Sequence, residues 1–504
     1  MTAEAAYATL IRATREAGLL DSCAELLGWD EDTCMPPGGV AHRGRQMALL
    51  AGLVHERWTD PRLGEWLAAV EGSSLVADPS SAEAVNVREL RRAVDRAGRL
   101  PRTLVEELAQ VTSIAHQEWA IARRRADFAR FRPLLERIVH LKRHEVESLG
   151  WADEPYDALL EDYEPGARSK AIGQLLATLC DELAPLFAAI AGAKRQANVG
   201  LLSRRYPLQR QRTFAQKVAA AVGFDFGRGR LDSTTHPFFS IIGPGDVRIT
   251  TRYAMQRFGD AFFATLHEVG HGLYEQGLPP EHHGTPMGDS PSLGMHESQA
   301  RLWENAVGRS RGFWQHFFPL ARTMFPTALR EVGLDAFHFA IHHVTPSLNR
   351  VQADEVTYNL HIRVRFELER ALIHGDLAPA DVPAAWNEAY RRYLGVTPAD
   401  DGEGCLQDSH WAAGMFGYFP TYALGNVFAA QITARATADL GDMDRQFARG
   451  DFAVLRDWLS ERIYGVGGRY SAVQLIERVT GCPPDHRPLV QALQRAYGEL
   501  YGLG

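Results

Sequence analysis

Two histidines and a glutamate lie close together in the stretch "FFATLHEVGHGLYEQG", at His267, Glu268 and His271. Residues four positions apart share one face of an α-helix, so His267 and His271 can offer two imidazole nitrogens to one metal ion. Glu268 is rotated by about 100° from His267 on such a helix, yet it stays within reach of a water molecule held by that ion. The H-E-x-x-H spacing therefore indicates metal-dependent hydrolysis with the glutamate as general base.

The surroundings of this motif favour a metal site over a chance match. Apolar residues recur through it at helical spacing, which predicts a buried face: Phe258, Phe262, Leu266, Val269 and Leu273. Gly277 and Pro279 then supply a helix stop. The small residues Gly270 and Gly272 predict that another element approaches closely. Two histidines and a glutamate on a buried face would be costly to desolvate without a ligand.

A catalytic zinc ion needs a third protein ligand and keeps one position for water. The segment "GMHESQARLWENAVGRS" offers Glu297, which lies 26 positions after His271, across a Gly/Pro-rich turn. Ser290 and Pro291 predict the start of the helix that carries it. His296 is the alternative ligand, but a residue one step away on a helix faces another direction. We therefore expect zinc, one ion per chain, bound by the two histidines and Glu297.

A helical glutamate ligand is often followed four residues later by an aspartate that orients a histidine. The corresponding residue here is Arg301, so the ligands must be oriented differently. Glu304, two turns after Glu297, is the residue that we expect to support a histidine ligand.

Helical periodicity dominates the rest of the chain and predicts an all-α fold. The clearest predicted helices cover roughly Ser169–Asn198, Phe258–Gln276, Ser298–Phe318, Asp354–His374 and Tyr422–Leu440. Alternation in "GDVRITTRYAM" predicts a short β-ribbon beside the site. No long linker or fixed-period repeat interrupts the sequence. We expect a single domain over 1–504, with an N-terminal helical lobe at about 1–230 and a catalytic region at about 231–504.

The composition is that of an ordinary globular protein, with 45% apolar and 23% charged residues. The net charge of −8 argues against nucleic acid as a partner. No run approaches eighteen apolar residues, so we expect no membrane-spanning segment. The five cysteines form no C-x-x-C pair, which is typical of reduced thiols. A soluble, cytoplasmic protein is the expectation.

With these residues in place, the chain resembles the carboxypeptidase Taq family of thermostable zinc metallocarboxypeptidases. The resemblance extends over most of the chain and rests on six short motifs in one order. They are "HPF" (236–238), "DVRIT" (246–250), "HEVGH" (267–271), "HES" (296–298), "NRVQAD" (349–354) and "GCLQDSHW" (404–411). Each motif is weak alone, but their common order is specific.

The resemblance implies a mostly helical body with a deep active-site cleft, similar in shape to neurolysin and the angiotensin-converting enzymes. It implies a homodimer that releases single residues from peptides with a free C-terminal carboxylate. Broad specificity is expected, with proline disfavoured at the end. Zinc is the implied metal, and cobalt is expected to support activity in its place.

The segment "GCLQDSHWAAGMFGYFPTYALGN" contains candidates for stabilising the tetrahedral oxyanion, which needs a hydrogen-bond donor beside the metal. They are His410, Tyr418 and Tyr422. Similar helical-cleft peptidases use a tyrosine a few residues past such a histidine, so we expect Tyr422 to act and Tyr418 to be the alternative. A purely structural role, packing with neighbouring phenylalanines, also fits both tyrosines. Gln407 and Asp408 are expected to shape the pocket or to orient His410.

A carboxypeptidase must also bind a free carboxylate, for which the planar arginine fork is well suited. Arg350 is our first candidate and Arg248 the second. The structural alternative for Arg350 is a salt bridge to Asp354 or Glu355. His236 is a candidate for hydrogen bonding to the substrate backbone, although a capping or core role fits it equally well.

Two other functions are compatible with parts of this pattern. An oligo-endopeptidase or a dipeptidyl carboxypeptidase would use the same metal chemistry, because only the point at which the cleft closes separates them. A non-catalytic peptide-binding protein would be expected to lack a ligand or the base. Both histidines, Glu268 and Glu297 are present, which argues against that alternative.

Overall fold

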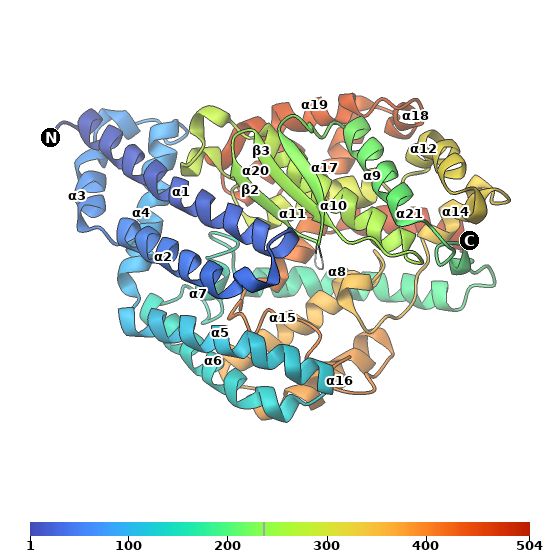
Figure 1. The fold of residues 1–504 in the computed structure, drawn as a ribbon, viewed down its shortest axis with the longest axis horizontal. Helices are drawn as coiled ribbons and strands as arrows, with labels where there is room; N and C mark the ends of the chain where they lie inside the picture. Colours follow the sequence, from blue (N-terminus) through green and yellow to red (C-terminus); the bar gives the residue numbers. More distant parts are fainter. Residues whose placement is uncertain (235–236, 504) are drawn as a thin grey trace.

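The computed structural model of the protein describes residues 1–234 and 237–503. The fold is mainly helical, which confirms the predicted class (Figure 1). The helices are α1 (Ala3–Thr33), α2 (Val40–Trp58), α3 (Pro61–Val70), α4 (Ala82–Arg99), α5 (Arg102–Arg125), α6 (Phe128–Leu149), α7 (Asp157–Leu160), α8 (Ser169–Ala191), α9 (Leu208–Val222), α10 (Phe258–Gly277), α11 (Leu293–Arg301), α12 (Arg311–Met324), α13 (Pro326–Leu329), α14 (Leu334–Ile341), α15 (Tyr358–His374), α16 (Val382–Leu394), α17 (Phe419–Leu440), α18 (Met443–Ala448), α19 (Ala453–Arg462), α20 (Ala472–Thr480) and α21 (Arg487–Tyr501).

The predicted β-ribbon is present and has one strand more than expected. Strand β2 (Phe239–Gly243) pairs antiparallel with β3 (Asp246–Thr251), and β1 (Gly229–Ser233) pairs parallel with the other edge of β3. Val247 and Ile249 of β3 are buried, and β3 packs on α10. The sheet therefore lies directly against the helix that carries the H-E-x-x-H motif.

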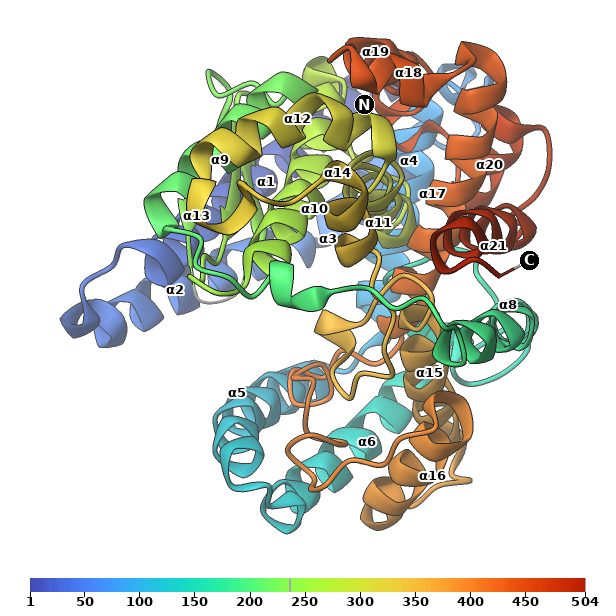
Figure 2. The same ribbon diagram turned by 90° about the vertical axis from the view of Figure 1, so that its right-hand side faces the viewer.

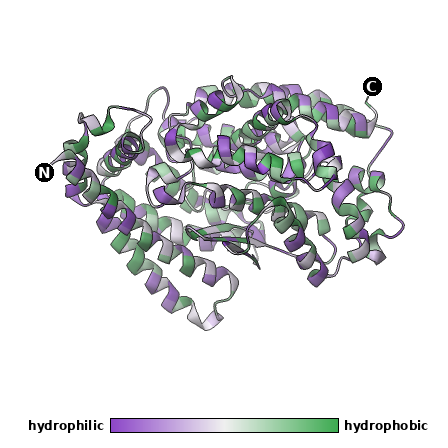
Figure 3. Cartoon of the chain, turned by 90° about the horizontal axis from the view of Figure 1, so that it is seen from above, coloured by the Kyte–Doolittle hydropathy of each residue, from purple (hydrophilic) through white to green (hydrophobic). Residues whose placement is uncertain are grey.

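Helices from distant parts of the sequence surround the site. In Figure 2, α5 and α6 lie beside α15 and α16 in the lower part of the molecule, while α10, α11 and α17 lie above them. Hydrophobic and hydrophilic residues alternate along the helices, as an amphipathic fold requires (Figure 3). One large buried core runs from residues of α5 to residues of α21, and a smaller core joins α1, α3 and α4. The lobe boundary near residue 230 stays a prediction.

The predicted helix at Ser298–Phe318 is wrong, because the segment is divided. Helix α11 starts earlier, after Ser292, whose hydroxyl accepts a hydrogen bond from the Met295 backbone N–H. The helix then widens into a π-helical segment, Leu302–Val307, before α12 begins. Such π segments depend on packing rather than on apolar period, so periodicity alone does not reveal them.

Among the described residues, α8 is long and apolar enough, by length and composition alone, to cross a membrane. The expectation that no segment reaches that threshold needs this correction. Leu176, Leu179 and Leu183 of α8 are buried, and the helix packs on α15 and α21. A core helix with such contacts passes the same test.

Candidate metal and catalytic centre

Helix α10 presents both histidines of the motif to one point. The imidazole rings of His267 and His271 have centroids 4.8 Å apart and lie nearly perpendicular to each other. The arrangement results from their four-residue separation on a helix whose other faces are buried in the core.

Glu297 of α11 completes the cluster. Its Oε2 lies 3.6 Å from Nε2 of His267 and 3.7 Å from Nε2 of His271. One donor atom from each of the three residues lies within 4.8 Å of the others, so together they can hold a metal ion. His296, the alternative ligand, instead contacts Glu275, with 2.8 Å between its Nε2 and the carboxylate.

Two glycines allow the ligand helices to approach this closely. A side-chain carbon at Gly270 of α10 would lie 2.6 Å from the backbone of Ala300 in α11. A side-chain carbon at Gly425 of α17 would lie 2.4 Å from Cγ of Glu297. Both contacts are far shorter than van der Waals distance, so only glycine fits at either position.

Two charged residues, Glu304 and Arg301, contact the metal ligands on the side away from the metal position. Oε2 of Glu304 lies 2.9 Å from Nδ1 of His267, as expected for a carboxylate that orients a histidine ligand. Arg301 donates hydrogen bonds to Glu297 at 2.8 Å and to Glu304 at 3.1 Å. Burial alone would raise the pKa of Glu304, but Arg301 and His267 outweigh it and lower the pKa to about 2. Arg301 thus connects the two carboxylates and stands where an aspartate is often found.

Glu268 is buried beside the cluster, and burial raises the pKa of its carboxyl group to about 7. Its Oε2 has no hydrogen-bond partner within residues 1–234 and 237–503. A carboxylate with a free oxygen and a pKa near neutrality is suited to accept and return a proton. Two imidazole nitrogens and one carboxylate oxygen are a ligand set of catalytic zinc sites, and Glu268 adds an unpaired base beside them. The residues present therefore fit the metal.

The structure brings the predicted oxyanion residues together. The hydroxyl group of Tyr422, on α17, lies 3.2 Å from Nε2 of His410. The Tyr418 ring packs against both His410 and Tyr422. Burial lowers the pKa of His410 to about 3 and raises the pKa of both tyrosines, that of Tyr418 to about 12. A neutral imidazole and protonated phenols result, and the phenols are hydrogen-bond donors.

Arg350 is buried and forms a salt bridge, although with neither acid named in its structural alternative. Its guanidinium contacts Oδ1 of Asp408 at 2.9 Å and donates to the Tyr358 hydroxyl at 3.0 Å. The same guanidinium lies over the Tyr422 ring, 4.6 Å from its centre. Both terminal nitrogens retain N–H groups beyond these bonds. Arg350 therefore lies beside the predicted oxyanion donor, Tyr422, and keeps N–H groups that can bind a further acceptor.

Asp408 is shared by a second arginine. Arg365 of α15 is fully buried and contacts the other carboxylate oxygen of Asp408 at 2.6 Å. It also donates to Gln407, whose side-chain oxygen accepts the backbone N–H of Arg350. In the described part of the chain, Asp408 is the only carboxylate that pairs with either arginine. The group therefore carries one excess positive charge.

Arg248 makes no contact with this centre among the residues that the structure describes. Arg248 forms a bidentate ion pair with Asp246, at 2.9 and 2.7 Å, and its guanidinium lies over the Trp29 ring. These contacts fit a structural role on the sheet. His236 lies outside the described residues.

Sequence reasoning missed Arg365 and Tyr358 as members of the site. A signal was present in "NLHIRVRFELER", where Arg365 falls within an apolar helical pattern. A charged residue at a buried helical position requires a partner, so it marks a buried ion pair.

Comparison with known proteins supports the same chemistry. The family model described as "Carboxypeptidase Taq (M32) metallopeptidase" matches residues 9–497. "Thermostable carboxypeptidase 1" of Thermus thermophilus is 52% identical over the full length of both chains. "Carboxypeptidase 1" of Bacillus subtilis is 34% identical over 94% of this chain and 95% of its own. The solved structure of the M32 carboxypeptidase from Deinococcus radiodurans superposes with a TM-score of 0.95 at 40% identity, covering 99% of this chain and 100% of that chain.

Proposed function

Because this chain belongs to the carboxypeptidase Taq (M32) metallopeptidase family and is a metallocarboxypeptidase, we propose that it removes single residues from peptide C termini with one zinc ion. The convergence of His267, His271 and Glu297 carries this proposal. Nitrogen and carboxylate donors in this number favour zinc, and cobalt accepts similar ligands. A divalent metal at this point supplies Lewis acidity, which lowers the pKa of water and polarises a carbonyl group.

Side chains of the protein carry out proton transfer and oxyanion stabilisation. Glu268 accepts the proton of the attacking water on its free Oε2 and returns it to the leaving amine. Tyr422 donates its hydroxyl hydrogen to the oxyanion that develops on the scissile carbonyl, and His410 holds that hydroxyl in place. Tyr418 is the alternative donor.

Arg350 binds the substrate's terminal carboxylate in this proposal. The excess positive charge that Arg350 and Arg365 share over Asp408 favours an anion at this point. A buried excess charge is costly unless a partner arrives, so a carboxylate is bound more tightly than a neutral amide. Arg350 lies 4.6 Å from the centre of the Tyr422 ring, which supports binding of the carboxylate next to the oxyanion donor.

A timed digest of mixed peptides, followed by mass spectrometry, tests the proposal. We expect successive loss of single C-terminal residues, loss of cleavage when the terminal carboxyl group is amidated, and loss of all cleavage with a chelator. Internal cleavage of amidated peptides would favour an oligo-endopeptidase, and release of residue pairs would favour a dipeptidyl carboxypeptidase.

We further propose that the enzyme is a cytoplasmic homodimer. The assembly rests on the family resemblance and the compartment on the cysteine pattern. Sedimentation and cell fractionation test these two proposals.

A further inference from the structure

The turn "EDYEPG" (161–166), which follows α7, contacts the start of helix α11. Its backbone is fixed locally, because the N–H groups of Tyr163 and Glu164 both donate to the last carbonyl of α7, at 2.9 and 2.7 Å. The Tyr163 carbonyl accepts the Leu293 N–H at 3.0 Å, and a side-chain oxygen of Glu164 accepts the Gly294 N–H. None of the steps proposed for the metal centre uses this turn.

These bonds satisfy backbone N–H groups that a helix leaves free in its first turn. The hydroxyl group of Ser292 accepts the next one, that of Met295, at 3.0 Å. Three successive N–H groups at the start of α11 therefore have acceptors, and the turn supplies two of them. The metal ligand Glu297 lies three residues after Gly294, so the turn holds the part of the helix from which Glu297 projects.

The contact at Gly294 is too close for any side chain. A side-chain carbon there would lie 2.4 Å from Oε1 of Glu164 and 3.3 Å from Cβ of Leu424 in α17. The Glu164 side chain is buried, and burial raises the pKa of its carboxyl group to about 7. A displacement of this carboxyl group would therefore be felt where α11 packs against α17.

The same turn contacts the oxyanion residues. The Tyr163 ring lies 5.1 Å from the Tyr418 ring, at 71° to it. The Tyr418 ring in turn lies 5.3 Å from that of Tyr422. One turn of the chain thus adjoins both the helix that carries the third metal ligand and the pair of tyrosines.

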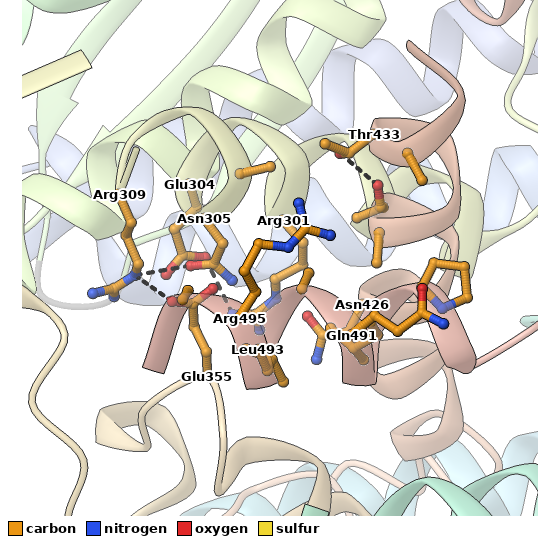
Figure 4. A pocket seen from close by; sticks show the side chains of 18 of the residues that line it. Arg301, Glu304, Asn305, Arg309, Glu355, Asn426, Thr433, Gln491, Leu493 and Arg495 are labelled. Carbon is orange, nitrogen blue, oxygen red and sulfur yellow. Dashed lines mark hydrogen bonds and ion pairs between the residues drawn. The ribbon is translucent and has the colours of Figure 1, made fainter. Parts of the chain in front are cut away.

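The opposite end of α11 borders open space. A cavity of about 510 Å³ adjoins this end, and Arg301, Glu304 and Asn305 lie in its wall (Figure 4). Arg301 is the last residue of α11, and the other two belong to the π segment. Because open space borders this end, the contacts at the other end contribute more to holding the helix in place.

We propose that Glu164 is a positioning residue for the metal centre. By accepting the Gly294 N–H it sets the position of α11, and through α11 the position of the Glu297 carboxylate. The inference rests on the proposed function, in which Glu297 is a zinc ligand. Glu164 would act only through the helix, and not by touching the metal or the substrate.

Zinc affinity, measured by competition with a chelator, tests this role. Glu164→Ala removes the acceptor and is expected to lower the affinity about tenfold, at the lower end of the range for groups that orient metal ligands. Glu164→Gln keeps a side-chain oxygen at the same place and should restore most of the affinity. The absorption spectrum of the cobalt-loaded protein reports the geometry of the ligands, so it should change in Glu164→Ala and not in Glu164→Gln.

Asp162→Ala is the matched control. Asp162 lies in the same turn but is exposed, and it pairs with Arg96 of α4 at 2.6 Å rather than with α11. Loss of that ion pair should leave the zinc affinity and the cobalt spectrum unchanged. If Glu164→Ala does not fold, Glu164→Asp shortens the side chain by one methylene group and gives the same test with a smaller expected loss.

Three results in folded variants would overturn the assignment. Unchanged zinc affinity and cobalt spectrum in Glu164→Ala would mean that the carboxyl group serves stability alone. An equal loss in Glu164→Gln would mean that a side-chain acceptor is not what positions α11. An equal loss in Asp162→Ala would mean that Glu164 has no specific role within the turn.

Glu297→Ala, measured in the same way, separates this inference from the proposed function. It should abolish tight zinc binding. Zinc binding that survives this change would contradict the proposed metal centre, whatever the result for Glu164, so the two failures are distinguishable.

Discussion

The metal cluster and the carboxylate-binding group have opposite charge arrangements. At the metal cluster, the ligand Glu297 and the supporting carboxylate Glu304 share one guanidinium, that of Arg301. At the other group, two guanidiniums, those of Arg350 and Arg365, share the carboxylate of Asp408. The first group therefore has one excess negative charge, and the second has one excess positive charge. In the proposed function, a cation completes the first group and the substrate's own carboxylate completes the second. The difference would then separate metal binding from substrate selection.

Glu268→Gln should have the largest effect, because it removes the proton carrier and leaves both charge groups intact. Turnover is expected to fall on the order of 10³-fold, within the range for loss of a general base. Metal content by mass spectrometry and binding of a carboxylate inhibitor should stay unchanged. Loss of metal in this variant would show that the base and the ligand cluster are not independent.

Glu304→Gln should weaken metal binding without changing substrate binding. Removing the carboxylate that orients His267 is expected to lower metal affinity by about 10- to 100-fold. Competition with a chelator measures this change. KM for a free-acid peptide should return to normal at saturating metal. The exposed variant Glu388→Gln is the control. An altered KM of Glu304→Gln at saturating metal would show that metal binding and substrate binding are not independent.

Arg365→Met should weaken the binding of free-acid substrates without changing metal binding. Its effect should be smaller than that of Glu304→Gln. Without Arg365, Asp408 neutralises Arg350, so the attraction for a terminal carboxylate falls. We expect KM for free-acid peptides to rise about tenfold, equivalent to about 1.4 kcal/mol, while metal affinity is unchanged. Arg363→Met, two residues away on α15 and paired with Asp181 and Glu367, is the matched control. An unchanged KM would show that the excess charge has no role in recognition.

Glu369→Gln should have the smallest effect, confined to the pH dependence of stability, because this buried carboxyl forms no ion pair within the described residues. It accepts hydrogen bonds from Tyr156, Trp411 and the Gly417 backbone, and burial raises its pKa from 4.5 to about 7. Between these values the folded protein keeps a proton that the unfolded chain releases, so stability falls as pH rises through this window.

The slope of that fall is at most about 1.4 kcal/mol per pH unit. Urea unfolding at pH 5 and pH 8 measures it, and Glu369→Gln should reduce the difference between the two free energies of unfolding. An unaltered difference would show that Glu369 is ionised throughout.

Sequence reasoning found the parts of the site that are encoded locally. The helical spacing of His267 and His271 and the apolar pattern around them predicted α10 almost to the residue, and Glu297 was found from ligand chemistry. The pairing of Arg350 with Asp408 joins residues 58 positions apart, and no local period reports such a contact. The division of α11 from α12 was missed because the apolar pattern continues through the π segment.

The π segment has a consequence for the tolerance of the chain to changes in length. A π turn holds about one residue more than an α turn, so removing Trp303 would let this segment rewind as ordinary helix, and the residues after Val307 would keep their register. Glu304 would move one position, about 100° round the helix, relative to α11. The carboxylate at position 304 would then swing away from the imidazole that it orients, although no chemically active group had been deleted. Insertions and deletions here should therefore be far more damaging than most substitutions of the same residues.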